Sequence, residues 1–275
     1  MPDDSFQPIV LQGPEGAMAK LCAHGAHLTS WRTTDGVERL FTSSTTEYRS
    51  GAAIRGGVPI IFPQFAGLGA LPKHGFARTA QWQRMTTPSD PADSVLFRLQ
   101  DSETTRALWP QQFIADYAVT LGKDALRMTL SIRNTDQQAW SFTAALHTYL
   151  RVQDITQVSI TGLQGLRYSD SAAGGVLNTE SAPDVRVVGE VDRIYFSTRQ
   201  PITLCEQGQR ALVCSAEGFA DTVIWNPGAQ KGASLSDLEA DGYRRMVCVE
   251  AAAIGEPIVL QPGATWSGTQ YLRLA

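Results

Sequence analysis

The chain has 275 residues and a formal net charge of −4, with 43% hydrophobic and 18% charged residues. This composition is ordinary for a soluble globular protein. The negative net charge argues against a nucleic-acid partner, because binding to a phosphate backbone requires a basic surface. It does not exclude a small anionic ligand, which needs only a few local cations.

The N-terminal sequence MPDDSFQPIV is acidic and has neither the basic nor the apolar region of a secretion signal. No apolar run approaches the ~18 residues of a membrane span. The cysteines form no CxxC pair, and no Cys/His spacing resembles a zinc site. They are Cys22, Cys205, Cys214 and Cys248. Free thiols are typical of a reducing compartment, so we expect a cytoplasmic protein that does not bind membranes.

Alternation between apolar and polar residues is the dominant period along the chain. It predicts strands, in chain order, at residues 19–31, 95–100, 113–121, 126–134, 157–163 and 211–216. In residues 126–134, LRMTLSIRN, every second side chain is apolar, which is typical of a half-buried antiparallel strand.

Helical periodicity is scarce. The best candidate is residues 234–246, SLSDLEADGYRRM, which begins with a serine cap and has acidic residues early. Glycine and proline are scattered, and no linker or internal repeat divides the chain. Many strands with few helices favour an all-β fold, a large antiparallel β-sandwich in which residues 1–275 form a single domain.

Residues 53–65, AIRGGVPIIFPQF, form the first segment that could carry chemistry. Gly56 and Gly57 permit backbone geometry that a side chain would forbid, and Arg55 precedes them. One interpretation is an arginine held rigidly at the rim of a site. The alternative is a turn at a sheet edge with an exposed arginine.

The second segment is residues 71–78, LPKHGFAR, in which His74 and Arg78 flank a glycine. The planar guanidinium of arginine suits phosphate and carboxylate oxygens, which indicates an anion site. A solvated basic loop is the alternative, because this spacing of histidine and arginine is weak evidence by itself.

The third segment is residues 142–152, FTAALHTYLRV. Alternation places His147 in the middle of a strand, on the same face as Tyr149 and Arg151. These neighbours make a pocket wall plausible, although a histidine in a strand can equally be a structural residue.

The fourth segment is residues 246–255, MVCVEAAAIG, where Glu250 ends a nearly apolar strand. An ionised carboxylate is costly to bury without partners. Glu250 is therefore either a surface residue at the end of the strand or a base whose pKa is tuned by a partly desolvated pocket.

Two further patterns give weaker evidence. His24 and His27 have a metal-like HxxH spacing, but no glutamate or cysteine completes a metal site. Residues 190–195, EVDRIY, place Glu190 and Asp192 on one face of a predicted strand, which is equally consistent with a solvated acidic edge.

Taken together and in this order, the motifs resemble one family. The combination AIRGGVPIIFPQF, PKHGFAR, FTAALHTYLRVQDI, GEVDRIY, DTVIWNPG and YRRMVCVEAA is similar to the hexose-6-phosphate mutarotases, the glucose-6-phosphate 1-epimerases of the aldose 1-epimerase superfamily. The resemblance extends from about residue 20 to residue 272. It implies a galactose mutarotase-like fold, a large twisted antiparallel β-supersandwich.

The resemblance also implies a role for each site residue. His147 would be the general acid and Glu250 the general base for opening the sugar ring at C1. Arg55 and Arg78 would hold the substrate phosphate. His74 and Asp192 would line the sugar site. The implied partner is a small sugar phosphate, no cofactor or metal is required, and we expect a monomer.

The sequence departs from the family pattern at Gln64, where an aromatic residue is expected, and in the polar-poor stretch AGLGALPK. Both are expected to flank the pocket. Three other functions remain open: a mutarotase for unphosphorylated aldoses, a carbohydrate-binding sandwich without activity, and a glycoside hydrolase with a pair of carboxylates.

Overall fold

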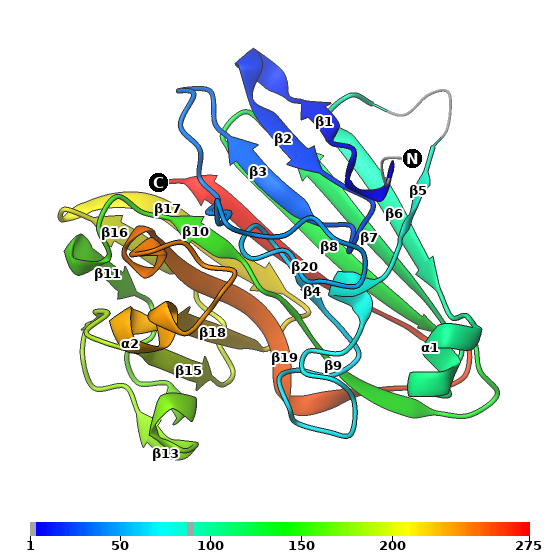
Figure 1. Cartoon of the computed structure of the whole chain (residues 1–275). Helices are drawn as coiled ribbons and strands as arrows, with labels where there is room; N and C mark the ends of the chain where they lie inside the picture. Colours follow the sequence, from blue (N-terminus) through cyan, green and yellow to red (C-terminus); the bar gives the residue numbers. More distant parts are fainter. Residues whose placement is uncertain (1–3, 87–90) are drawn as a thin grey trace.

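Antiparallel strands make up most of the fold in the computed structural model, which describes residues 4–86 and 91–275. Within these residues the strands form three sheets of three, eight and nine strands (Figure 1). The two larger sheets share one buried apolar cluster, so the polypeptide is a β-sandwich as predicted. In the described part of the chain, no helix is long and apolar enough to cross a membrane.

The bounds of the strands follow the order of each sheet. The small sheet contains β1 (Ile9–Gln12), β2 (Met18–Leu21) and β3 (Leu28–Arg32). The eight-stranded sheet contains β13 (Val176–Thr179), β12 (Arg167–Asp170), β15 (Val191–Tyr195), β18 (Asp221–Asn226), β19 (Met246–Leu260), β9 (Trp140–Leu146) and β4 (Ile60–Ile61), and β10 (Tyr149–Arg151) also pairs with β19. The nine-stranded sheet contains β14 (Asp184–Val185), β11 (Val158–Thr161), β16 (Ile202–Glu206), β17 (Gln209–Glu217), β20 (Thr265–Leu274), β8 (Ala125–Asn134), β7 (Phe113–Leu121), β6 (Ser94–Gln100) and β5 (Gln83–Met85).

Helices are short and lie outside the sheets. The α-helices are α1 (Glu103–Leu108) and α2 (Gly228–Ala233). The 3-10 turns are η1 (Asp4–Phe6), η2 (Pro14–Gly16), η3 (Ala77–Thr79), η4 (Ile155–Gln157), η5 (Ser171–Ala173) and η6 (Gly242–Arg245). The helix predicted over residues 234–246 is wrong: that segment forms turns followed by η6. Asp241 and Gly242 inside it interrupt helical propagation, since Asp241 adopts a left-handed φ of 58°.

The predicted alternation in β8 is confirmed. Its inward side chains are Leu126, Met128, Leu130 and Ile132, all fully or almost fully buried. The segment 19–31, by contrast, is not one strand but the hairpin β2–β3, because a tight turn at Gly25 and Ala26 reverses the chain. The strand that carries Glu250 is longer than predicted, so Glu250 lies within β19 rather than at its end.

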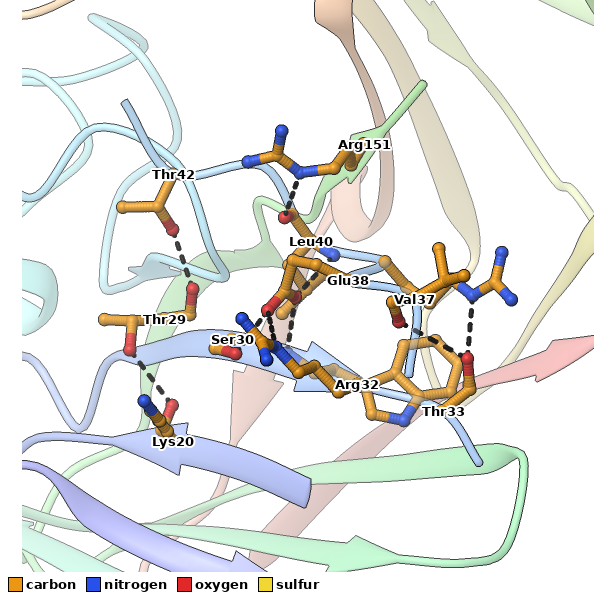
Figure 2. Close-up of polar contacts among 12 residues, drawn as sticks. Lys20, Thr29, Ser30, Arg32, Thr33, Val37, Glu38, Leu40, Thr42 and Arg151 are labelled. Carbon is orange, nitrogen blue, oxygen red and sulfur yellow. Dashed lines mark hydrogen bonds and ion pairs between the residues drawn. The ribbon is translucent and has the colours of Figure 1, made fainter. Parts of the chain in front are cut away.

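A polar cluster fixes the segment that follows β3 (Figure 2). The carboxylate of Glu38 accepts hydrogen bonds from the backbone N–H groups of Trp31 (2.8 Å) and Leu40 (3.1 Å) and from the Ser30 hydroxyl. The Thr42 hydroxyl donates to the Thr29 carbonyl at 2.7 Å. Residues 38–42 are thereby held against β3, where they form one wall of the turn that contains the IRGG motif.

Two buried tyrosines provide a test of this packing. The Tyr117 hydroxyl has no hydrogen-bond partner among the described residues, whereas the Tyr195 hydroxyl donates to Glu180 at 2.8 Å. Burying an unpaired hydroxyl is costly, so Tyr117→Phe should leave the free energy of unfolding unchanged or raise it by up to ~1 kcal/mol. Tyr195→Phe should lower it by ~1–3 kcal/mol. Urea denaturation of both variants measures the difference, and equal losses would contradict this assignment.

Candidate functional site

A cavity of about 590 Å³ opens on one face of the eight-stranded sheet. This face points away from the apolar cluster that the two larger sheets share. Its volume lies in the range typical of small-molecule sites. All the residues predicted for the site line this one cavity. They are Arg55, His74, Arg78, His147, Asp192 and Glu250.

An interruption in strand pairing places the histidine and the glutamate face to face. β19 pairs with β9 on one side of a gap and with β10 on the other, in the same register. Leu146 is opposite Ala251 and Tyr149 is opposite Cys248. His147 is therefore opposite Glu250, in the gap. The prediction that His147 lies in the middle of a continuous strand is wrong, because the strand breaks at this residue.

The ring of His147 is fixed by its neighbours. It stacks on Tyr149 with centroids 4.8 Å apart and an interplanar angle of 12°, and Trp225 contacts it edge-on. Its Nδ1 lies 3.3 Å from Oε1 of Glu250, without the angles of a hydrogen bond. Among the described residues, neither this nitrogen nor Oε2 of Glu250 has a hydrogen-bond partner, although both are buried. The hydrogen-bonding capacity of the pair is thus not used up by contacts among the described residues.

Burial shifts the pKa values of this pair in opposite directions. Desolvation lowers the pKa of His147 well below its usual value, and the positive charges of Arg55 and Arg78 add to the effect. Desolvation also raises the pKa of Glu250 well above its usual value, with a further contribution from Asp192. Since burial disfavours both ions, the pair holds a single proton over a wide range of pH.

The two arginines end in the same cavity. Arg55 donates from Nη1 to the Tyr149 hydroxyl at 2.9 Å and forms an ion pair with Asp237 at 3.0 Å. Arg78 donates from Nη2 to the Lys73 carbonyl at 3.0 Å. The Nε atoms of both arginines are buried and lack partners among the described residues. Since both side chains also line the cavity, their guanidinium groups can donate to the oxygens of an anion there.

These arginines also line a second, polar cavity of about 490 Å³, together with Tyr149 and Asp237. The guanidinium groups consequently lie between two open spaces. Asp237 belongs to the segment that was predicted to be helical, and its contact with Arg55 was missed for that reason.

The turn that carries Arg55 explains the HxxH motif. Nε2 of His27 donates to the Gly56 carbonyl at 2.8 Å, and Nε2 of His24 lies 2.6 Å from the Ala52 carbonyl. Burial lowers the pKa of His27 to about 4, so it is a neutral donor. The two histidines thus support the backbone on either side of Arg55.

His74 and Asp192 complete the cavity wall. The backbone N–H of Ala66 donates to Nδ1 of His74 at 3.2 Å, and burial lowers the pKa of this histidine to about 3. The proton of the neutral ring is therefore on Nε2, which can donate to a ligand. Asp192 projects from β15, and burial raises its pKa. Lys73 and Lys231 also line the cavity.

Gln64 does not line the cavity, contrary to expectation. Its side chain turns into the following loop, where Nε2 donates to the carbonyls of Ala66 and Leu71 and Oε1 accepts from the Leu71 N–H. Gln64 therefore has a structural role: its hydrogen bonds shape the loop that carries Leu68 to the cavity rim.

One set of side chains in the described residues has metal-ligand spacing. Donor atoms of His147, Cys248 and Glu250 lie within 4.8 Å of one another. Burial raises the pKa of the Cys248 thiol well above its usual value, and a protonated thiol is a poor ligand. The positive charge of Arg55 and Arg78 also opposes a cation here. The arrangement fits an acid–base pair better than a metal centre.

The fold and this site place the protein in the class of β-sandwich proteins with a buried histidine–glutamate pair and two arginines in one cavity. The sequence model of the family "Aldose 1-epimerase" matches residues 7–273. The chain belongs to this family.

Similar proteins agree with this assignment. A relative from Cenchrus ciliaris is 35% identical over 96% of this chain and 83% of its own length, and one from Escherichia coli K12 is 34% identical over 92% and 85%. Both are named "putative glucose-6-phosphate 1-epimerase". A solved structure of a "putative mutarotase" from Salmonella typhimurium is 30% identical, with a TM-score of 0.88 over 97% of this chain and 89% of that protein.

The geometry of the IRGG turn can be tested with two glycines. A Cβ on Gly56, at φ 110°, would lie 2.3 Å from the Phe41 carbonyl oxygen and 2.4 Å from the Thr42 Cα. Gly36 also has a positive φ, but a Cβ there would meet nothing within 4 Å. Gly56→Ala should therefore lower the free energy of unfolding by roughly 3 kcal/mol or more, and Gly36→Ala by about 1 kcal/mol. Chemical denaturation measures both, and similar losses would show that steric contact is not the reason for Gly56.

Proposed function

We propose that the protein interconverts the α and β anomers of a hexose 6-phosphate, with glucose 6-phosphate as the preferred sugar. The observation that carries this proposal is the pairing of His147 with Glu250 across the strand gap. Two arginines line the same cavity, and their guanidinium groups suit a phosphate. The names of the relatives point to the same reaction.

The reaction follows from the chemistry of a hemiacetal. Glu250 removes the proton from the C1 hydroxyl while His147 donates a proton to the ring oxygen, and the bond between C1 and that oxygen breaks. Rotation about C1–C2 presents the other face of the aldehyde. The ring closes with the two roles exchanged, so the site regains its original number of protons.

The shared proton suits this reversal. The pair can hold it as imidazolium and carboxylate or as neutral imidazole and carboxylic acid, and burial favours the neutral form. Each form supplies one acid and one base on the two sides of the hemiacetal. A positioned acid or base typically contributes about 10²–10⁴-fold to the rate.

The two arginines would hold the phosphate. A phosphate dianion satisfies several of its oxygens with two guanidinium groups, and Lys73 adds positive charge. His74 and Asp192 would bind sugar hydroxyl groups between the phosphate and the acid–base pair.

Three further expectations belong to this proposal. The one apolar cluster that spans both large sheets supports a single domain over residues 1–275. The cavity is formed by one chain, which supports action as a monomer. All four cysteines are free, which supports a reducing, cytoplasmic location.

The arginines provide the first test of substrate class. Arg55→Ala and Arg78→Ala should each raise KM for glucose 6-phosphate at least ~10-fold and leave the kinetics with free glucose nearly unchanged, because each removes a charge-assisted contact to phosphate. Polarimetry or NMR exchange on freshly dissolved anomers measures both rates above the spontaneous reaction. Arg127→Ala, on the outer face of the other sheet, is the control. Equal losses with both sugars would show that the arginines do not recognise phosphate.

The acid–base pair provides the second test, through pH. Activity should fall in acid when His147 takes up a second proton, below its usual pKa, and in alkali when Glu250 loses the last proton, above its usual pKa. The profile of kcat should therefore be a broad bell. Glu250→Gln should lower kcat by roughly 10³-fold or more and abolish the alkaline limb.

The matched control is Glu180→Gln, since Glu180 is also buried but pairs with Arg193 and Tyr195 away from the cavity. It should retain kcat and the full bell. A pH profile of the unmodified protein that is flat from acid to alkali would contradict the roles given to His147 and Glu250.

A further inference from the structure

Two buried polar side chains lie directly behind the acid–base pair and have no part in the mechanism above. Gln270 is 2% exposed and projects from β20, in the nine-stranded sheet. Thr148 is fully buried and follows His147 in the strand break. An amide and a hydroxyl in an apolar interior are costly unless they are hydrogen-bonded.

These side chains bond to each other and to the strand that carries Glu250. The Thr148 hydroxyl donates to Oε1 of Gln270 at 2.6 Å, and Nε2 of Gln270 donates to the Val249 carbonyl at 2.9 Å. The Val249 N–H donates to the Thr148 carbonyl at 3.1 Å. The three residues thus form a closed ring of hydrogen bonds that joins β20, the break and β19.

The ring replaces a hydrogen bond that the break removes. By register, Thr148 is opposite Val249, and a regular antiparallel pair would exchange two backbone hydrogen bonds there. Only one of these exists, because the Thr148 N–H instead donates to the Leu146 carbonyl at 2.9 Å, in a tight turn around His147. The amide of Gln270 occupies the position that this N–H has left.

We propose that Gln270 and Thr148 are positioning residues, which stabilise the strand break and thereby fix the orientation of the His147 ring relative to Glu250. Without the amide, the Val249 carbonyl would be buried and unpaired. The cheapest way to satisfy it is for the Thr148 N–H to return to it. The strand would then become regular. By register His147 would stay opposite Glu250, but the turn that sets the orientation of its ring would be lost.

The effect on catalysis rests on the proposed function. A misplacement of about 1 Å at a reacting group can cost 10²-fold in rate. Substrate binding depends on the arginines, which lie on other segments and do not contact the hydrogen-bonded ring of Thr148, Gln270 and Val249. Loss of the ring should therefore lower kcat while KM changes little.

The experiment compares near-isosteric variants at and beside the ring. Thr148→Val and Gln270→Met should each lower kcat for glucose 6-phosphate by about 10-fold or more, with KM changed less than about 3-fold. The double variant should lose no more than the worse single variant, since both disrupt one ring. Thr148→Ser retains the hydroxyl and should keep most of the activity.

Thr269→Val is the matched control. Thr269 precedes Gln270 on β20, and its hydroxyl shares a hydrogen bond with that of Thr129 at 2.9 Å on the other face of the sheet. This variant should lose stability similar to Thr148→Val but keep kcat. A comparable fall in kcat for Thr269→Val, or full kcat in Thr148→Val, would overturn the proposal.

A readout without turnover separates this proposal from the proposed function. The chain has four histidines, so the His147 ring signals can be assigned in a ¹H–¹³C NMR spectrum by comparison with a His147→Gln variant. They should shift in Thr148→Val and stay in place in Thr269→Val, whether or not any sugar is turned over.

Unshifted signals in a folded Thr148→Val would overturn the positioning role. Absence of activity in the unmodified protein would overturn only the proposed function. Should Gln270→Met not fold, Thr148→Val decides alone.

Discussion

β19 pairs with β9 and then with β10, and the gap between these two pairings is the constraint on which the site depends. Antiparallel register fixes which residues are opposite, and it sets His147 against Glu250 without any loop having to find the right conformation. The side chain of Glu250 reaches the cavity from within the continuous strand β19, because strand side chains project out of the sheet. The break releases His147 toward the cavity while the flanking pairs hold its position, so rigidity and access come from the same device.

Burial is the second constraint, and it acts on charge. The cavity wall holds two carboxyl groups, two histidines and two arginines with little exposure to water. Desolvation raises the pKa of both carboxyl groups and lowers the pKa of both histidines, which favours their neutral forms. The arginines cannot lose their protons, so they retain charge and recruit Asp237 as a partner. Together with Lys73 and Lys231 they make the cavity positive, which matches a ligand with an anionic group.

The β-sandwich and the predicted residues that line the cavity could be predicted from the sequence, because both follow from patterns within short segments. Alternation identifies β8 regardless of its partners, and the motifs around Arg55, Arg78, His147 and Glu250 are contiguous. The sequence was insufficient wherever a contact joins distant segments. The helix predicted at residues 234–246 failed because two residues of unfavourable propensity end it, and Asp237 was missed with it. The break at His147 and the contribution of Gln270 depend on pairing across more than a hundred residues, which periodicity cannot register.

Tyr149 connects Arg55 with His147. Its ring stacks on His147, and its hydroxyl accepts a hydrogen bond from Arg55. Both contacts are made by one buried side chain at the start of β10, so a single residue lies between Arg55 and the ring of His147. A phosphate bound by Arg55 would thereby be linked, through Tyr149, to the ring of His147. Binding energy from a group that takes no part in the reaction can then be used to position the reacting group, which is the general advantage of a remote anchor in catalysis. The same connection explains why the arginine is held by Tyr149 and Asp237 before any ligand arrives: a free guanidinium would lose its freedom only on binding, and that cost would be subtracted from the energy available to align His147.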